Sequence, residues 1–570
     1  MKHFNLKRLF EWTRNQKLLY YIFIVALVVP NIVLVFTEET SFFGRVCNIV
    51  FPVAMFWFLM SLARKPGKAL WLMFWFVFLD AFQLVLLYLF GNSIIAVDMF
   101  LNLLTTNSGE AGELLAGIIV GVVIVVVFYL IILSLAIISL FNKERLSRDF
   151  LRHQRKLSGN ALMYSTILCV CVLLFSSRFR IEEDVYPLNV CYNALLAIGR
   201  ADKTADYYET SNGFKYNASS TRDANEPEVY VFVVGETARA MDFGIYGYKR
   251  NTTPELAKCG DNLLVYKDAL SQSNTTHKSV PMLLSSASAE NYDAVYTHKG
   301  IITAFNEAGY RTAFLSNQRH NNSFIDFYGG EATTSIFIKD LYPEGANVMD
   351  AELLKHLKRE LRNDHRKKFI VLHSYGSHYD YYSRYGREFA EFTPDSVKEL
   401  SRKNRELLVN SYDNSIRYTD AFVKSVIDAV DALGVSSAVI YTSDHGEDIF
   451  DDSRNMFLHA SPLPSYYQIH VPYLVWVSDT FKSQHATEYN MLKANVNEPI
   501  STSLVTFHTL LSMAGIRTFV FDGSCALSDH DFKARDRYYL SDHNKPKLLN
   551  ECGLKECDFE KFREFGLREY

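Results

Sequence analysis

Five apolar blocks separated by polar loops occupy the first third of the chain. They cover residues 18–36, 46–62, 69–90, 114–140 and 161–177. A helix that crosses a bilayer needs about 20 mostly apolar residues, so the second and fifth blocks are short but sufficient with their flanks. Buried helices of a soluble core are the alternative, but the block 114–140 contains no charged residue. The pattern therefore predicts a membrane domain of five transmembrane helices over residues 1–177.

The hydrophobic pattern changes after the fifth block. Residues 178–227 form a polar connector, and after it short β-rich runs occur at 229–234, 311–315, 368–373, 437–442 and 472–476. Helical stretches such as 350–363 and 402–432 separate these runs. Strands that alternate with helices indicate an α/β domain with a mainly parallel sheet covered by helices on both faces. We expect this domain to span residues 228–570.

Charge in the loops predicts how the membrane domain is oriented. The chain as a whole is nearly balanced, with 59 basic and 63 acidic residues, and it has no nucleic-acid-binding motif. Fourteen basic residues fall before the first block, between the second and third, and between the fourth and fifth, whereas the two opposite loops, 37–45 and 91–113, contain only Arg45. Basic loops stay in the cytoplasm. This places the N-terminus there and exports everything after the fifth span.

Cysteines in the exported part permit disulfides. Cys259, Cys525, Cys552 and Cys557 lie there, enough for two bonds. Cys552 and Cys557 are close enough in sequence to close a small loop, which would leave Cys259 with Cys525, but spacing alone leaves the pairing open.

Side chains of the types that bind metal ions follow two of the predicted strands. Glu236 comes just after the apolar run 231–234, and Asp444 and His445 come just after 439–442. Because ligands in such sheets gather at the carboxyl ends of the strands, these three side chains are expected to converge. Carboxylate and imidazole together suit zinc or manganese.

Thr276 is the candidate nucleophile. It lies where the polar segment 271–275 turns into a helical stretch, and we expect it at the N-cap. A hydroxyl there, bound to a divalent cation, would be activated towards a phosphate that the helix amides help to hold. The alternative is that Thr276 only caps the helix.

Six motifs, taken in order, resemble a known family. They are Val234-Gly235-Glu236-Thr237-Ala238-Arg239, Thr276-x-x-Ser279-Val280-Pro281, Asn317-Gln318, His373-x-x-Gly376-Ser377-His378, Ser443-Asp444-His445-Gly446-Glu447 and Leu458-His459. With five preceding spans, the chain resembles the membrane-anchored phosphoethanolamine transferases of Gram-negative bacteria. These enzymes modify lipid A or core sugars and include the mobile colistin-resistance enzymes. The resemblance implies an alkaline-phosphatase/sulfatase-like catalytic domain.

The resemblance also implies roles for single residues. Glu236, Thr276, Asp444 and His445 correspond to a tightly held Zn²⁺ site, with Thr276 the residue that becomes phosphoethanolaminylated. His378 and His459 correspond to histidines that contact the substrate headgroup or a second metal. His373 is assigned to the same region, with support of the loop as its alternative role.

Three polar residues between the third and fourth spans complete the resemblance. Asn102, Thr106 and Glu110 recur every four residues and would share one face of a helix. In the family this spacing marks residues that engage the lipid headgroup, whereas a solvated loop helix is the plain alternative.

The sequence departs from the family beside the nucleophile. Many relatives carry a cysteine pair that brackets it, but Gln272 and Met282 occupy the matching positions here. The loop that carries Thr276 must therefore be held by other contacts.

These observations predict a two-step transfer at the outer face of the bacterial inner membrane. Phosphatidylethanolamine would be the donor, and lipopolysaccharide, at a lipid A phosphate or a core sugar, the acceptor. Loss of anionic surface charge would then lower sensitivity to polymyxin. A phosphoglycerol transferase resembling lipoteichoic acid synthase and a catalytically inactive membrane protein are the rival functions. A sulfatase is disfavoured because no Cys/Ser-x-Pro-x-Arg motif occurs at the nucleophile.

Overall fold

The computed structural model describes the chain except for residues 1–12, 39–40, 91–93, 106–107, 177–178 and 398–399. For residues 89–90, 102–105 and 108–120 it describes the backbone only. The chain forms two compact units, residues 1–100 with 118–198, and residues 101–117 with 199–570. Each unit is described separately below.

Apolar helices make up most of the first unit. They are α2 (Gln16–Thr37), α3 (Phe42–Met60), α4 (Pro66–Leu72), α5 (Phe74–Phe90), α7 (Ser108–Phe141) and α8 (Arg148–Phe175). Among the described residues, four helices are long and apolar enough to cross a membrane, and α4 with α5 adds a fifth if that pair, bent by 69°, counts as one span. The predicted span 69–90 is therefore broken at Met73, between the two helices.

The predicted connector is mostly helical. Residues 178–227 contain α9 (Ile181–Asp184), α10 (Leu188–Ala205), α11 (Tyr207–Thr210) and the short strand β1 (Ser219–Ser220). The short helix α6 (Val97–Thr105) precedes α7.

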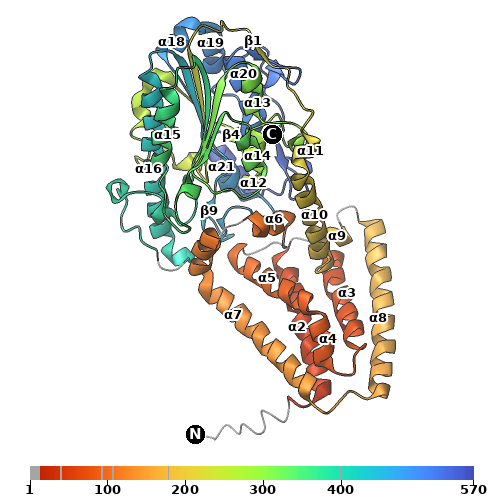
Figure 1. Cartoon of the computed structure of the whole chain (residues 1–570). Helices are drawn as coiled ribbons and strands as arrows, with labels where there is room; N and C mark the ends of the chain where they lie inside the picture. The colour runs from red at the N-terminus through yellow and green to blue at the C-terminus, as the bar shows by residue number, and fades with distance from the viewer. Residues whose placement is uncertain (1–12, 39–40, 91–93, 106–107, 177–178, 398–399) are drawn as a thin grey trace. The chain divides into compact units, whose positions relative to one another are not determined.

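A seven-stranded sheet forms the centre of the second unit (Figure 1). Its order is β3-β11-β8-β2-β7-β5-β6. The bounds are β2 (Glu228–Gly235), β3 (Leu263–Tyr266), β5 (Arg311–Ser316), β6 (Thr334–Phe337), β7 (Lys367–His373), β8 (Ser436–Ser443) and β11 (Tyr473–Val477). All five predicted strands are present. The sheet is mixed, because β11 pairs antiparallel with both β8 and β3 while the other pairs are parallel.

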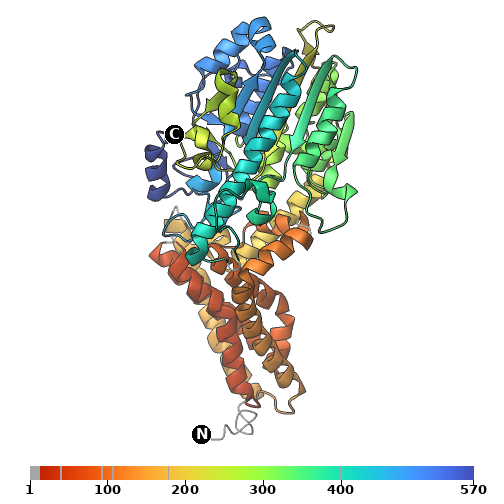
Figure 2. The same ribbon diagram turned by 90° about the vertical axis from the view of Figure 1, so that its left-hand side faces the viewer.

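Helices cover both faces of this sheet, as the sequence predicts. Figure 1 shows α15 (Ala351–Leu361) and α16 (Arg405–Asp431) on one face, and α12 (Thr276–Leu283), α13 (Ile301–Glu307), α14 (Phe324–Gly330) and α20 (Thr502–Met513) on the other. In Figure 2, turned by 90°, α16 crosses in front of the strands. The remaining helices are α17 (Tyr466–Ile469), α18 (Asp479–Gln484), α19 (Ala486–Ala494) and α21 (Glu556–Glu564).

Short strand pairs complete the unit. They are β1 with β13 (Ile516–Arg517), β4 (Ala269–Leu270) with β12 (Ile500–Ser501), β9 (Asp448–Ile449) with β10 (Phe457–Leu458), and β14 (Tyr538–Leu540) with β15 (Pro546–Leu548).

Strand β2 shows how the core positions the site. Every residue of β2, β7 and β8 is buried, as expected for central strands of a doubly covered sheet. Alternate side chains of β2, those of Tyr230, Phe232 and Val234, belong to one buried apolar cluster with Phe305 of α13 and Leu510 of α20. Each such large side chain contributes about 1.5–3 kcal/mol by burial. The strand is thus held rigidly where its carboxyl end enters the site.

Candidate metal and nucleophile site

Strand register brings the predicted metal ligands together. Gly235 at the end of β2 pairs with Ser443 at the end of β8, so the residues that follow, Glu236 and Asp444, leave the sheet at the same edge. Glu236, Asp444 and His445 are buried, and their ligand atoms lie within 4.8 Å of one another. The convergence that the sequence predicts is therefore present.

One carboxylate oxygen of Asp444 accepts hydrogen bonds, and the other has no hydrogen-bond donor. Its Oδ1 accepts hydrogen bonds from the backbone N–H groups of Thr237 (3.1 Å) and His445 (2.7 Å). Its Oδ2 is buried without a hydrogen-bond donor, 3.2 Å from His445 Nε2. Burial raises the pKa of Asp444 from 3.8 to about 6. An unpartnered buried carboxylate oxygen is costly in a protein interior and fits a cation ligand.

His445 presents one ring nitrogen to this cluster. Its Nδ1 lies 2.9 Å from the carbonyl oxygen of Gly446, to which it donates, so Nε2 carries the lone pair. Burial lowers the pKa of His445 well below its usual value, which favours the neutral ring that binds metals. Nε2 lies 3.5 Å from Glu236 Oε1.

Thr276 places its hydroxyl on this cluster. Its Oγ1 lies 3.1 Å from His445 Nε2 and 3.4 Å from each carboxylate oxygen of Glu236. The prediction that Thr276 is the N-cap is wrong by one residue, because Thr275 is the cap of α12 and Thr276 is its first helical residue. No side-chain hydrogen bond caps this helix. The Thr276 hydroxyl is therefore directed to the ligands rather than to the helix amides.

The backbone around Glu236 is constrained. Thr237 has a positive φ of 59°, which is uncommon for a β-branched residue, and its hydroxyl donates to Glu236 Oε1 at 2.7 Å. Tyr412 on α16 donates to the carbonyl of Thr237 at 2.8 Å. Gly376 also has a positive φ, 49°, and a Cβ added there would lie 2.6 Å from the carbonyl oxygen of Glu236. The segment that carries the carboxylate is thus fixed from both sides.

A second ligand group shares Glu236. The ligand atoms of Glu236, His378 and His459 lie within 4.8 Å of one another. His378 has its Nδ1 2.6 Å from the carbonyl of Tyr379, and His459 has its Nδ1 3.3 Å from Glu447 Oε1. Both rings therefore direct Nε2 away from these partners, as in His445.

Glu447 and Tyr381 belong to the site, although no sequence signal assigns them a role. Glu447 is buried, and its second oxygen, Oε2, accepts a hydrogen bond from the Tyr381 hydroxyl at 2.8 Å. Glu447 is visible in the motif that contains Asp444 and His445, but nothing in its spacing indicates that it contacts His459. That contact depends on the loop between β9 and β10.

The other predicted site residues lie elsewhere or outside the described residues. His373, at the end of β7, is fully buried with Nδ1 3.1 Å from Ser316 Oγ, and it belongs to neither ligand group. Asn102 and Glu110 fall within α6 and α7, but their side chains, and all of Thr106, lie outside the described part of the structure.

Hydrogen bonds hold the loop that carries the nucleophile. Gln272 accepts from the backbone N–H of Ala289 (3.1 Å) and the hydroxyl of Ser503 (2.9 Å), and it donates to Glu290 (3.0 Å) and the carbonyl of Tyr538 (3.1 Å). The disulfides that the sequence permits do not form, because all eight cysteines, each within the described residues, are free thiols. Gln272 thus supplies the crosslinking contacts that a cysteine would provide.

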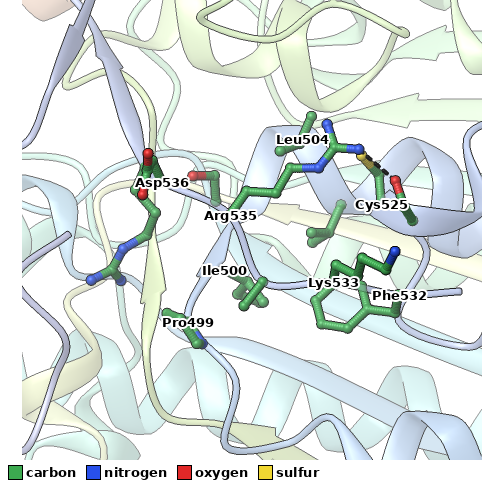
Figure 3. A pocket seen from close by; sticks show the side chains of 13 residues that line it. Pro499, Ile500, Leu504, Cys525, Phe532, Lys533, Arg535 and Asp536 are labelled. Atoms are coloured by element: carbon green, nitrogen blue, oxygen red, sulfur yellow. Dashed lines mark hydrogen bonds between the residues drawn. The ribbon is translucent and has the colours of Figure 1, made fainter.

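Two cavities of the second unit differ greatly in size. One of about 450 Å³ is lined by His277 and Lys278, which follow Thr276, and by the rings of Tyr208, Tyr292, Tyr296, Phe324 and Phe327. The other, beside Cys525 and Arg535 (Figure 3), has a volume of about 10 Å³. The small cavity has room for about one water molecule, so of these two the aromatic cavity is the one large enough for a substrate group.

Comparison with known proteins agrees with this geometry. The sulfatase family model matches residues 228–516, about half of the chain. Phosphoethanolamine transferase EptC of Escherichia coli K12 is 26% identical over 335 residues, 57% of each chain. The Kdo(2)-lipid A phosphoethanolamine 7''-transferase of the same strain is 31% identical over 297 residues, 50% of this chain and 51% of the relative. The alignments therefore span a little over half the length of these relatives.

Solved structures extend the likeness. The C-terminal periplasmic domain of E. coli EptC in complex with Zn is 25% identical, with a TM-score of 0.54, over 58% of this chain and 94% of that one. The integral membrane protein EptA of Neisseria meningitidis, at 23% identity, shares the fold over 88% of this chain and 98% of that one, with a TM-score of 0.69. Fold, ligand cluster and family model agree, and the chain belongs to the sulfatase family.

Proposed function

We propose that this protein transfers phosphoethanolamine from phosphatidylethanolamine to lipopolysaccharide, at a lipid A phosphate or a core sugar, through a phosphoethanolaminyl-Thr276 intermediate. The observation that carries the proposal is the position of Thr276 Oγ1, 3.1 Å from His445 Nε2 and 3.4 Å from both oxygens of Glu236. The names of the relatives support the choice of phosphoethanolamine.

The donor set fits a resident Zn²⁺. Glu236, Thr276, Asp444 and His445 would hold one tightly bound ion, and Glu236, His378 and His459 could hold a second. Carboxylate, imidazole and hydroxyl donors suit zinc, and the unpartnered Asp444 Oδ2 supports a cation there. When bound, the ion would lower the pKa of the threonine hydroxyl and offset negative charge on the phosphoryl oxygens.

The chain's own residues divide the chemistry into two displacements. In the first, Thr276 Oγ1 loses its proton and attacks phosphorus, the bond from phosphorus to the glycerol oxygen breaks, and diacylglycerol leaves with a proton. In the second, an oxygen of the acceptor attacks phosphorus and loses its proton if it is a hydroxyl, while Thr276 Oγ1 leaves and takes up a proton. His378 and His459, each with Nδ1 occupied, direct Nε2 towards the substrate side and are placed to move these protons.

The membrane part supports the choice of a lipid donor. We propose residues 1–177 as a five-span domain of the inner membrane, with α4 and α5 as one broken span, the N-terminus in the cytoplasm and residues 228–570 as the periplasmic catalytic domain. Asn102, Thr106 and Glu110 would engage the donor headgroup. The aromatic cavity beside His277 and Lys278 has the size and apolar lining for a lipid group.

Mass spectrometry of the intact protein tests the proposal. Detergent-solubilised protein with zinc and phosphatidylethanolamine, but no acceptor, should gain one phosphoethanolamine on Thr276, and Thr276→Ala should gain none. An adduct that forms only from phosphatidylglycerol would identify the rival phosphoglycerol transferase. If folded, zinc-loaded protein forms neither adduct, the protein is not this kind of transferase. In cells, loss of the gene should increase sensitivity to polymyxin.

A further inference from the structure

A second large cavity of the second unit is lined by residues that follow Glu236 along the chain. It has a volume of about 510 Å³ and lies among the loop after β2, the segment 248–250, the start of α16 and Asp451. Six arginine or lysine side chains and three carboxylates line it, and only Met241 and Val409 among its lining residues are aliphatic. Its lining is therefore cationic and polar, unlike that of the aromatic cavity beside Thr276.

Part of this positive charge is neutralised within the protein. Arg239 pairs with Asp242, and Asp451 bridges Arg239 (2.8 Å) and Arg405 (2.7 Å). Arg250 pairs with Asp413 at 2.8 Å. These pairs occupy two of the three carboxylates of the lining, and they hold the walls of the cavity in place.

Three cations of the lining form no ion pair among the described residues, although the charge of Arg402 helps to lower the pKa of Asp452. Lys249 and Lys403 make no hydrogen bond or ion pair within the described residues, and Arg402 donates only to the neutral side-chain oxygen of Asn455, at 2.7 Å. Arg405 adds a buried Nε with no hydrogen-bond acceptor. Cationic donors in a concave site raise the local concentration of anions. A buried N–H donor normally has a hydrogen-bond acceptor, which a bound anion would supply.

Contacts connect this cavity to the proposed reaction centre. Arg239 donates through Nη1 to the carbonyl of Glu447 at 3.1 Å, and the carboxylate of Glu447 contacts His459 Nδ1 at 3.3 Å. One wall of the cavity is thus shared with the support of His459. An in-line displacement requires the attacking acceptor oxygen to approach opposite Thr276 Oγ1.

We propose that this cationic cavity binds an anionic group, phosphate or carboxylate, of the saccharide acceptor. The inference rests on the proposed function and adds to it the position and chemistry of acceptor recognition. Lys249, Arg402 and Lys403 are its binding residues. The six cationic side chains of the lining favour a charged sugar group over an acyl chain as the occupant.

Two measurements on the full-length, zinc-loaded protein test the cavity and its occupant separately. The variant combines Lys249→Gln, Arg402→Gln and Lys403→Gln. The matched control combines Lys358→Gln, Arg359→Gln and Lys493→Gln, three exposed cations outside the cavity. In calorimetric titration with pyrophosphate, the cavity variant should bind about tenfold more weakly than the wild type, and the control should not change. Equal affinities in all three proteins would refute an anion site.

Kinetics of the two half-reactions then identify the occupant. The cavity variant should form the Thr276 adduct from phosphatidylethanolamine at the wild-type rate, while its KM for the acceptor rises about tenfold. A dephosphorylated acceptor should remove most of this difference if the bound group is a phosphate, and a carboxyl-reduced acceptor should do so if it is a carboxylate. An unchanged acceptor KM, or a slower first half-reaction, would overturn the assignment to the acceptor. If the wild type transfers nothing, the proposed function fails while the pyrophosphate titration still decides the site.

Discussion

Replacing Asp444 by asparagine separates two effects of the buried carboxylate: its cost to folding stability and its role in metal binding. In the metal-free protein the side-chain amide of the Asp444→Asn variant would keep the hydrogen bonds of the site. The amide oxygen can accept from the N–H groups of Thr237 and His445, and the amide nitrogen would stand where Oδ2 stands now, 3.2 Å from the His445 Nε2 lone pair. The substitution therefore removes charge with little change in shape.

The pKa of Asp444 sets the size and the sign of the effect. Burial raises this pKa from 3.8 to about 6 in the folded protein, a difference worth about 3 kcal/mol. Because the folded state disfavours the ionised carboxylate, the metal-free wild type loses stability as the pH rises from about 4 to about 6. Above about pH 6 the full loss of folding stability is present. At pH 7.5 Asp444→Asn should stabilise the metal-free protein by up to about 3 kcal/mol.

Thermal unfolding with and without metal measures this difference. After treatment with EDTA at pH 7.5, the variant should unfold at a higher temperature than the wild type, and the two should converge near pH 4. With zinc in excess the order should reverse, since a ligand that binds only the folded state stabilises it in proportion to its affinity. The wild type would gain this stabilisation and the variant would lose most of it.

Asp558→Asn is the matched control. Asp558 is also buried, but Arg454 and two backbone N–H groups, those of Tyr466 and Lys555, satisfy both of its oxygens. Its neutralisation should therefore destabilise the protein equally with and without zinc. The reasoning about Asp444 is refuted if Asp444→Asn lowers the unfolding temperature in EDTA, or if zinc stabilises the variant as much as the wild type.

Three further substitutions test the supports of the site. Gln272→Ala removes four hydrogen bonds, each of which contributes about 1 kcal/mol. Hydrogen exchange at the Ala289 amide should therefore become more than a hundredfold faster. An unchanged exchange rate would show that other contacts hold the loop. Glu447→Ala should lower the rate of transfer about 10–100-fold, because His459 would lose the contact that positions it. Glu447→Gln should keep a rate closer to that of the wild type. An equal loss of rate in both variants would show that the charge of Glu447 matters instead. Gly376→Ala should weaken zinc binding, because Gly376 has a positive φ and the added Cβ would lie 2.6 Å from the Glu236 carbonyl oxygen. Competition with a chelator measures the zinc affinity. An unaltered affinity would mean that the loop can move.

Much of the fold was predictable because it depends on local pattern. Runs of apolar residues about 20 long indicate spans, and short β-branched runs between helices indicate buried parallel strands. All five predicted strands are confirmed, and so is the convergence of Glu236, Asp444 and His445 just after β2 and β8. The edge strands β3 and β6 were not predicted, because strands of four residues at a sheet edge carry little periodic signal.

What the sequence determined by itself is the candidate site: Glu236, Asp444, His445 and Thr276 are metal-binding types of residue at two strand ends and a helix start. Tertiary structure alone decided how that set is supported and where anions can collect. The contact of Glu447 with His459, the four hydrogen bonds of Gln272 and the gathering of Lys249 with Arg402 and Lys403 join segments far apart in sequence. Hydrogen bonds and charge clusters of this kind have no period along the chain, so they exist only once packing has placed the segments side by side.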